Sequence, residues 1–181
     1  MNVELLITRL KKGDQRAYKE LVFHFTTRLM TIARIYSPSE EDAKDVLQDT
    51  FILVFRKIKQ FEGNEEKQLY GWIKRIVINL CLSRNQKKYR KMESSLDNMN
   101  FDKGVSADAI GNLTHQEIMD LVLNLPDGYR QVFALFAIEG YSHREIAEKL
   151  NIGESSSRSQ YSRAKKILQL QFNNLFNILI A

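Results

Sequence analysis

Five polar side chains recur at helical spacing near the end of the chain, where they would share one side of a single helix. They are Arg158, Ser159, Ser162, Arg163 and Lys166. Arginine donates hydrogen bonds to guanine or phosphate, and serine is short enough to permit close approach to a phosphate oxygen. A helix with such a face fits the major groove of DNA. The spacing is also compatible with an ordinary helical hairpin that has a polar surface.

The residues around this face have the sequence pattern of a helix-turn-helix. Ser142 with Glu145 predicts a capping box at the start of a first helix. Asn151–Gly153 would form the turn, and Glu154 or Ser155 would cap the second helix. The inward positions are Ile146 and Leu150 in the first helix and Tyr161, Ala164 and Leu168 in the second. One position departs from the pattern, because Ser157 stands where a helix-turn-helix usually has an apolar residue.

A second basic segment lies near the middle of the chain. Between Trp72 and Lys91 there are seven basic residues and no acidic one. Such a segment can follow phosphates while an aromatic residue stacks on a base. It can equally be a solvated helix end, where basic side chains complement the helix dipole.

The composition excludes several classes of protein. The only cysteine rules out a disulfide framework, and three widely separated histidines give no metal-binding spacing. We see no phosphate-binding glycine loop and no nucleophile elbow, so we expect no cofactor, no small-molecule substrate and no enzymatic activity. No leader peptide and no apolar run of about 20 residues is visible, which predicts a cytoplasmic protein.

The periodicity predicts an all-α protein with two helical domains joined by a flexible linker. We expect a helix over 14–36, a second begun by Ser37, Pro38 and Glu40, and a third over 69–85. The buried stripe of the second would be Leu47, Phe51, Val54, Phe55 and Ile58. Helices follow over 114–124 and 129–138. The predicted boundaries are 10–91 for the first domain, 92–113 for the linker and 114–181 for the second domain.

Two blocks of sequence, in this order, resemble a known family. GDQRAYKELVFHFTTRLMTIARIY, EEDAKDVLQDTFILVFRKIKQF and GWIKRIVINLCLSRNQKK are similar to region 2 of the sigma-70 factors of bacterial RNA polymerase. LPDGYRQVFALFAIEGYSHREIAEKLNIGESSSRSQYSRAKK is similar to their region 4. The chain therefore resembles a group IV, or extracytoplasmic-function (ECF), sigma factor over roughly residues 10–170.

The resemblance implies a partner for each block. The partners would be core RNA polymerase, through its beta-prime and beta subunits, and promoter DNA; an anti-sigma factor is a further candidate, since the family often has one. The residues implied to bind the beta-prime coiled coil are Asp45, Gln48 and Asp49. Those implied at the minus-10 element are Lys74, Arg75, Asn79, Arg84, Lys87 and Lys88, with Asn79 reading an unstacked base. Those implied at the minus-35 element are Arg158, Ser159, Ser162, Arg163 and Lys166.

Some residues differ from the family pattern. Ser83 and Gln86 stand where members often have Asp and Arg, and Ser156 and Ser157 replace a usual Thr-Val pair. A stand-alone regulator that binds an operator as a dimer remains an alternative function, because it explains the helix-turn-helix equally well. It leaves the acidic helix around Asp45 and the basic segment after Trp72 without a role.

Overall fold

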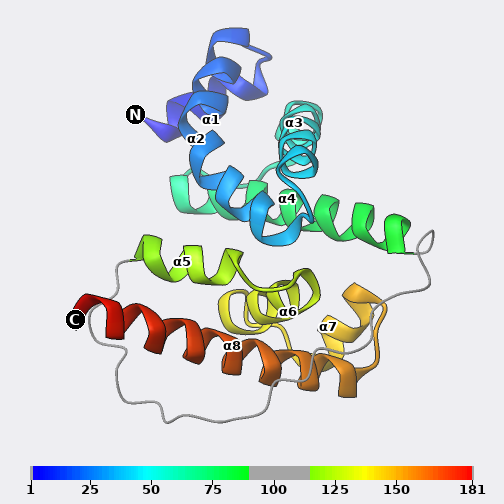
Figure 1. The fold of residues 1–181 in the computed structure, drawn as a ribbon. Coiled ribbons are helices and arrows are strands. Elements are labelled where there is room, and N and C mark those ends of the chain that lie inside the picture. Colours follow the sequence, from blue (N-terminus) through cyan, green and yellow to red (C-terminus); the bar gives the residue numbers. More distant parts are fainter. Residues whose placement is uncertain (1, 90–114, 181) are drawn as a thin grey trace. The chain divides into compact units, whose positions relative to one another are not determined.

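The computed structural model describes residues 2–89 and 115–180, and the side chains of residues 2–86 and 118–172. Every regular element in these ranges is a helix (Figure 1). The chain divides into two compact units, Met1–Lys87 and Lys88–Ala181. The all-α fold class is thus confirmed. The linker predicted at 92–113 lies outside the described residues, and the domain boundaries given above stay predictions.

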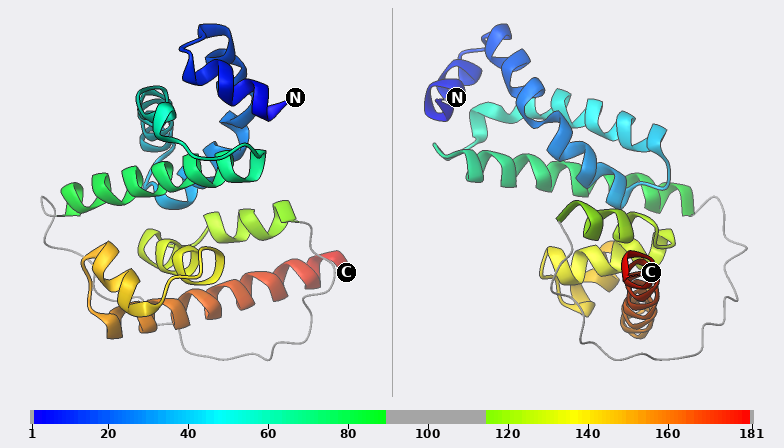
Figure 2. Two further views of the ribbon diagram at one scale, coloured as in Figure 1. Left: turned by 180° about the vertical axis from the view of Figure 1, so that it is seen from behind. Right: turned by 60° about the vertical axis from the view of Figure 1, so that its left-hand side comes forward.

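The first unit contains four α-helices and a short 3-10 turn. They are α1 (Val3–Lys11), α2 (Gln15–Tyr36), α3 (Glu40–Lys57), η1 (Ile58–Gln60) and α4 (Glu66–Tyr89). Helices α2 and α3 pack against each other, and α4 lies alongside them (Figure 2). Seven α2 residues predicted to face inward are all buried: Ala17, Leu21, Phe25, Leu29, Ile32, Ala33 and Tyr36. Helical periodicity alone therefore identified the core face of α2.

The start of α3 differs from the sequence prediction by two residues. Ser39, not Ser37, is the N-cap, and its side chain accepts a hydrogen bond from the backbone N–H of Asp42. Ser37 instead ends α2, where its N–H donates to the carbonyl of Ala33. Pro38 follows because a proline cannot continue the preceding helix. The acidic first turn of α3 then suits the positive end of the helix dipole.

Phe55 was predicted to lie in the buried stripe of α3, and this prediction was wrong. Its neighbours Phe51, Val54 and Ile58 are buried, but 47% of the surface of Phe55 is exposed. The ring packs edge-on against Tyr18 of α2, with 5.2 Å between ring centroids. A step of one residue turns the helix by about 100°, which moves Phe55 from the centre of the stripe to its edge.

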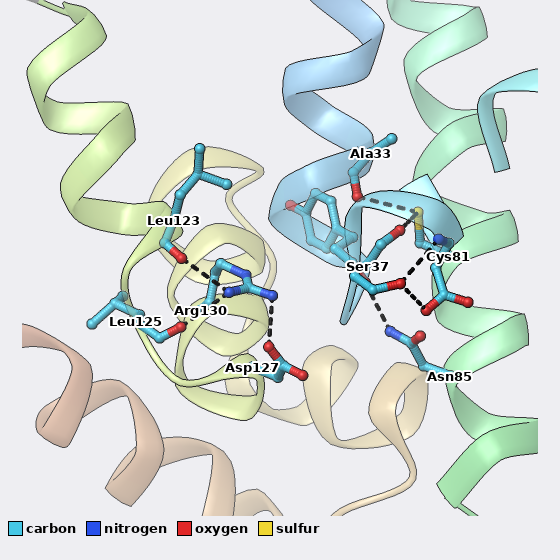
Figure 3. A network of polar contacts seen from close by, with 11 residues as sticks. Ala33, Ser37, Cys81, Asn85, Leu123, Leu125, Asp127 and Arg130 are labelled. Atoms are coloured by element: carbon cyan, nitrogen blue, oxygen red, sulfur yellow. Dashed lines mark hydrogen bonds and ion pairs between the residues drawn. The ribbon is translucent and has the colours of Figure 1, made fainter. Parts of the chain in front are cut away.

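Helix α4 begins three residues before the predicted start at Leu69 and is held to α2 by a buried polar cluster. The Asn85 side chain donates to the Tyr36 carbonyl at 2.8 Å, and Ser37 Oγ lies 3.5 Å from Cys81 Sγ (Figure 3). Burial raises the pKa of the Cys81 thiol to about 11, so this cysteine stays protonated and structural. Trp72 is half-buried and tilts against Phe61.

The second unit is built around one long helix. Its elements are α5 (His115–Leu123), α6 (Asp127–Phe133), the short π-helix η2 (Ala134–Ile138), α7 (His143–Leu150) and α8 (Glu154–Ile180). Helix α8 contacts α5, α6 and α7 and appears as the long orange-to-red helix in Figure 1. The predicted cap Thr114 lies outside the described residues, as do the side chains of the apolar tail after Phe172. Among the described helices none is long and apolar enough to cross a membrane.

Arg130 ties the end of α5 to the start of α6. Its guanidinium is buried and donates to the carbonyls of Leu123 and Leu125 at 3.1 and 3.0 Å. The other terminal nitrogen donates to Asp127 at 2.7 Å (Figure 3). The last carbonyls of a helix have no partner within the helix. Arg130 therefore supplies donors for the chain where α5 ends, and keeps α5 against the rest of the unit.

Candidate nucleic-acid interfaces

The turn between α7 and α8 has the geometry that the sequence predicted. Ser142 caps α7, and its side chain and that of Glu145 form the full capping box. Asn151 ends α7 in the left-handed conformation, with φ 55°, which asparagine tolerates better than most residues. Ile146 is fully buried beneath the turn. Helix α8 begins at Glu154, so neither Glu154 nor Ser155 precedes it as a cap, and Gly153 stands there instead.

The predicted recognition face lies on the outside of α8. All five of its residues are exposed: Arg158, Ser159, Ser162, Arg163 and Lys166. Ala164 and Ser157, on the opposite side of the helix, are fully buried. The structure therefore brings the five side chains together on one exposed face. Their contact with the minus-35 element stays a prediction.

Two arginines on this face are already oriented by neighbours. Arg158 forms an ion pair with Glu154, one turn earlier in α8. Arg163 donates to the hydroxyl of Tyr129 in α6 at 3.2 Å. Exposed pairs of this kind contribute little stability, so a phosphate or a guanine edge can replace either partner at small cost.

His143 joins the two helices of the turn, and the sequence analysis missed this residue. Its Nδ1 lies 2.9 Å from the hydroxyl oxygen of the buried Ser157. The imidazole stacks on Phe136, with 4.4 Å between ring centroids, and meets Tyr161 edge-on. Burial, reinforced by the positive charge of Arg158, lowers the pKa of His143 below its usual value. The unusual serine at 157 was the signal that a polar partner had to exist.

The candidate minus-10 residues do not share one face of α4. Arg75 and Asn79 are one turn apart and exposed. Arg84 follows Arg75 by nine positions, about two and a half helical turns, which places these two arginines on opposite sides of the helix. Lys74 is half-buried. Lys87 and Lys88 belong to the last turn of α4, but their side chains lie outside the described residues.

The candidate polymerase-binding residues lie on the outer side of α3. Asp45 and Gln48 are exposed. Asp49 is partly exposed and forms an ion pair with Arg84 of α4, with 2.5 Å between the carboxylate oxygen and the guanidinium nitrogen. One residue of the predicted polymerase surface thus neutralises one residue of the predicted DNA surface. Spacing along the chain gave no sign of this contact, because the two helices meet only in the fold.

Neither unit offers a site for metal chemistry within its described part. No cluster of three or more histidine, cysteine, aspartate or glutamate side chains able to hold an ion occurs at residues 2–86 and 118–172. The candidate site residues offer mostly hydrogen-bond donors on α4 and α8, and carboxylate and amide groups on α3, a pattern suited to binding.

Two family models match the chain, one for each unit. Sigma-70 region 2 matches residues 17–91 and sigma-70 region 4 matches residues 115–168, together more than half of the chain. The chain belongs to the sigma-70 family. Relatives named ECF RNA polymerase sigma-E factor include those of Escherichia coli K12, 28% identical over 177 residues, and of Haemophilus influenzae, 25% identical over 178 residues. The matches cover 91% of this chain and of the first relative, and 92% and 93% for the second. The sigma factor is therefore assigned to the ECF group.

Solved structures that match the chain include two protein complexes. CnrH in complex with the cytosolic domain of CnrY is 23% identical, with a TM-score of 0.49, covering 96% of this chain and 99% of that chain. RpoE in complex with the anti-sigma factor NepR, from Bartonella quintana, is 22% identical, with a TM-score of 0.48. That match covers 86% of this chain and 96% of the other.

Proposed function

We propose that this sigma factor binds core RNA polymerase, recognises the minus-35 and minus-10 promoter elements and promotes transcription initiation. The observation that carries the proposal is the exposed donor face of α8, held by a capped helix-turn-helix in the part of the chain that matches region 4. A helix presented in this way can enter the major groove and donate to base edges and phosphates. Arg158 and Arg163 are the candidates for base contacts, and Ser159, Ser162 and Lys166 for phosphate contacts.

The first unit would serve the polymerase and the minus-10 element. Asp45 and Gln48 offer an acidic and an amide group on the outer face of α3 to the beta-prime coiled coil. On α4, Arg75 offers hydrogen-bond donors to a phosphate, and Asn79 offers an amide that can read a base. Further positive charge along the same helix comes from Lys74, Arg84, Lys87 and Lys88. This charge strengthens binding to the DNA strand of the minus-10 element through counterion release.

Each unit is small, so neither is expected to hold a promoter tightly by itself. When core polymerase holds both units at a fixed separation, the second contact becomes intramolecular and gains effective concentration. The free chain should therefore bind promoter DNA poorly and select it only in the holoenzyme. The proposal involves no covalent chemistry and no cofactor, and it puts the protein in the cytoplasm with the polymerase.

Reconstituted transcription tests the proposal. Purified core polymerase is mixed with the full chain and with genomic fragments, and start sites are mapped with and without the chain. We expect defined start sites that depend on the chain and on core polymerase. A stand-alone operator-binding regulator would instead bind specific fragments without core polymerase and would not co-purify with it stoichiometrically, which would overturn the proposal.

A further inference from the structure

We propose that His143 is a positioning residue for promoter recognition: its hydrogen bond to Ser157 fixes how α8 presents its recognition face. This inference rests on the proposed function. It concerns four side chains from η2, α7 and α8, which we call the His143 clamp. They are Phe136, His143, Ser157 and Tyr161.

Burial makes the hydrogen bond of the clamp costly to lose. Ser157 is fully buried, and leaving its hydroxyl without a partner would be unfavourable. His143 Nδ1 lies 2.9 Å from that hydroxyl. Which of the two atoms carries the hydrogen depends on the histidine tautomer, but either arrangement joins the first residue of α7 to the first turn of α8.

The aromatic rings fix the orientation of the imidazole. His143 stacks nearly parallel to Phe136, at an interplanar angle of 15°, and Tyr161 packs against both rings. These contacts hold the imidazole with its Nδ1 beside the hydroxyl of Ser157. A residue supported from two sides in this way transmits the position of η2 to α8.

The preferred geometry of the hydrogen bond affects the position of the neighbouring residues. Apolar contacts are non-directional, so a helix packed only by them can rotate slightly about its axis. A buried hydrogen bond has a preferred distance and angle. Ser157 immediately precedes Arg158 and Ser159, so fixing its side chain fixes the rotation of the helix at the point where these two residues would meet DNA.

Two variants of equal shape test the role of the hydroxyl. Ser157→Thr keeps it, while Ser157→Val replaces it with a methyl group, and both add bulk to the same buried site. The readout is the ratio of transcripts from a promoter that the wild-type holoenzyme uses to those from the same promoter with its minus-35 element replaced. It is measured below the unfolding midpoint of every variant.

We expect Ser157→Thr to keep this ratio near the wild-type value and Ser157→Val to lower it about tenfold, the scale of one good base contact. His143→Phe, which keeps the stacked ring and removes the nitrogen, should lower the ratio to a similar extent. The combination of His143→Phe with Ser157→Val should be no worse than either variant alone. The dependence of promoter binding on salt should not change, because the phosphate contacts remain.

Equal ratios for the threonine and valine variants would overturn the clamp, as would independent effects of His143→Phe and Ser157→Val. If the larger side chains prevent folding, Ser157→Ala is compared with the wild type, because this variant removes the hydroxyl without adding bulk. An unchanged transcript ratio would then also contradict the clamp. A wild-type chain that directs no transcription with core polymerase sinks the proposed function, and the clamp with it. If the wild-type chain is selective and the variants have the same transcript ratio, the clamp is wrong and the proposed function stands.

Discussion

Arg84 of α4 and Asp49 of α3 form an ion pair, so a candidate DNA ligand and a candidate polymerase ligand neutralise each other in the free chain. Both side chains are partly exposed, and such pairs contribute at most about 1 kcal/mol to stability. The ion pair uses one donor of the guanidinium, and the carboxylate charge beside it weakens the attraction of Arg84 for a phosphate. Asp49 and promoter DNA should therefore compete for the charge of Arg84.

Removing the charge of Asp49 should release Arg84 for DNA. We expect Asp49→Asn to lengthen the lifetime of the open complex about two- to fivefold, which corresponds to less than about 1 kcal/mol. The same substitution in an Arg84→Ala background should have no effect on that lifetime. Lifetimes are measured with saturating chain on core polymerase, after a competitor is added. A gain that persists without Arg84 would contradict the competition.

A direct role for Asp49 in polymerase binding gives a different result. In that case Asp49→Asn weakens binding of the chain to core polymerase in the absence of DNA, whether or not Arg84 is present. Asp45→Asn is the positive control for this case, because Asp45 is a candidate polymerase-binding residue that is exposed on the same helix.

The two arginines on the outer face of α8 should carry promoter selectivity. Arg158→Ala or Arg163→Ala is expected to reduce discrimination by about 1–3 kcal/mol if the arginine makes a good base contact. The measurement compares holoenzyme transcription on promoters with intact and substituted minus-35 elements. Arg144→Ala on α7 is the control, since that arginine is highly exposed and only loosely paired with Glu148. Selectivity that stays intact in both α8 variants would remove these arginines from the interface.

Arg130 should be important for stability and not for DNA reading. Arg130→Met removes the donors to the carbonyls of Leu123 and Leu125. We expect the free energy of unfolding of the second unit to fall by about 2–4 kcal/mol, because two backbone acceptors lose a buried partner. Denaturant unfolding of the full chain, followed by circular dichroism, measures the loss. A change below about 0.5 kcal/mol, as at an ordinary surface position, would show that water replaces the arginine fully.

Stability should also depend on pH through His143. Its pKa is lowered in the folded chain, mainly by burial and then by Arg158. As the pH falls through the ordinary histidine range near about 6.5, the unfolded chain takes up a proton before the folded chain does. The free energy of unfolding should therefore decrease in this window and level off below the lowered pKa.

Comparison with His143→Phe isolates this contribution. Thermal midpoints of both chains are recorded between about pH 7.5 and 5.5, the range in which histidine titrates. The variant should show a shallower decrease than the wild type, whatever its absolute midpoint. The carboxylates with lowered pKa values, such as Glu145 and Glu66, titrate at lower pH and affect both chains equally. Parallel curves would mean that His143 titrates alike in the folded and unfolded chain.

The order of the helices from α2 onward was predictable because local sequence controls it; α1 and the π-helical form of η2 were not predicted. Apolar spacing identified the buried face of α2, and the Ser142–Glu145 capping box placed the start of α7. The exposure of the α8 face followed from the same period, since residues opposite a buried stripe face solvent. Where several caps were available, as at Ser37 and Ser39, local pattern placed the boundary of α3 two residues early.

Contacts between helices were decided only by the tertiary structure. Thirty-five positions separate Asp49 from Arg84, and the fourteen from His143 to Ser157 span a turn whose angle no local pattern sets. Phe55 shows a related limit: the helical period puts it at the edge of the apolar stripe, and the packing of α2 against α3 decided that this edge stays exposed. The sequence by itself determined which residues form helices and which faces are polar. The packing of those helices decided which polar groups are paired, and so which remain free to bind.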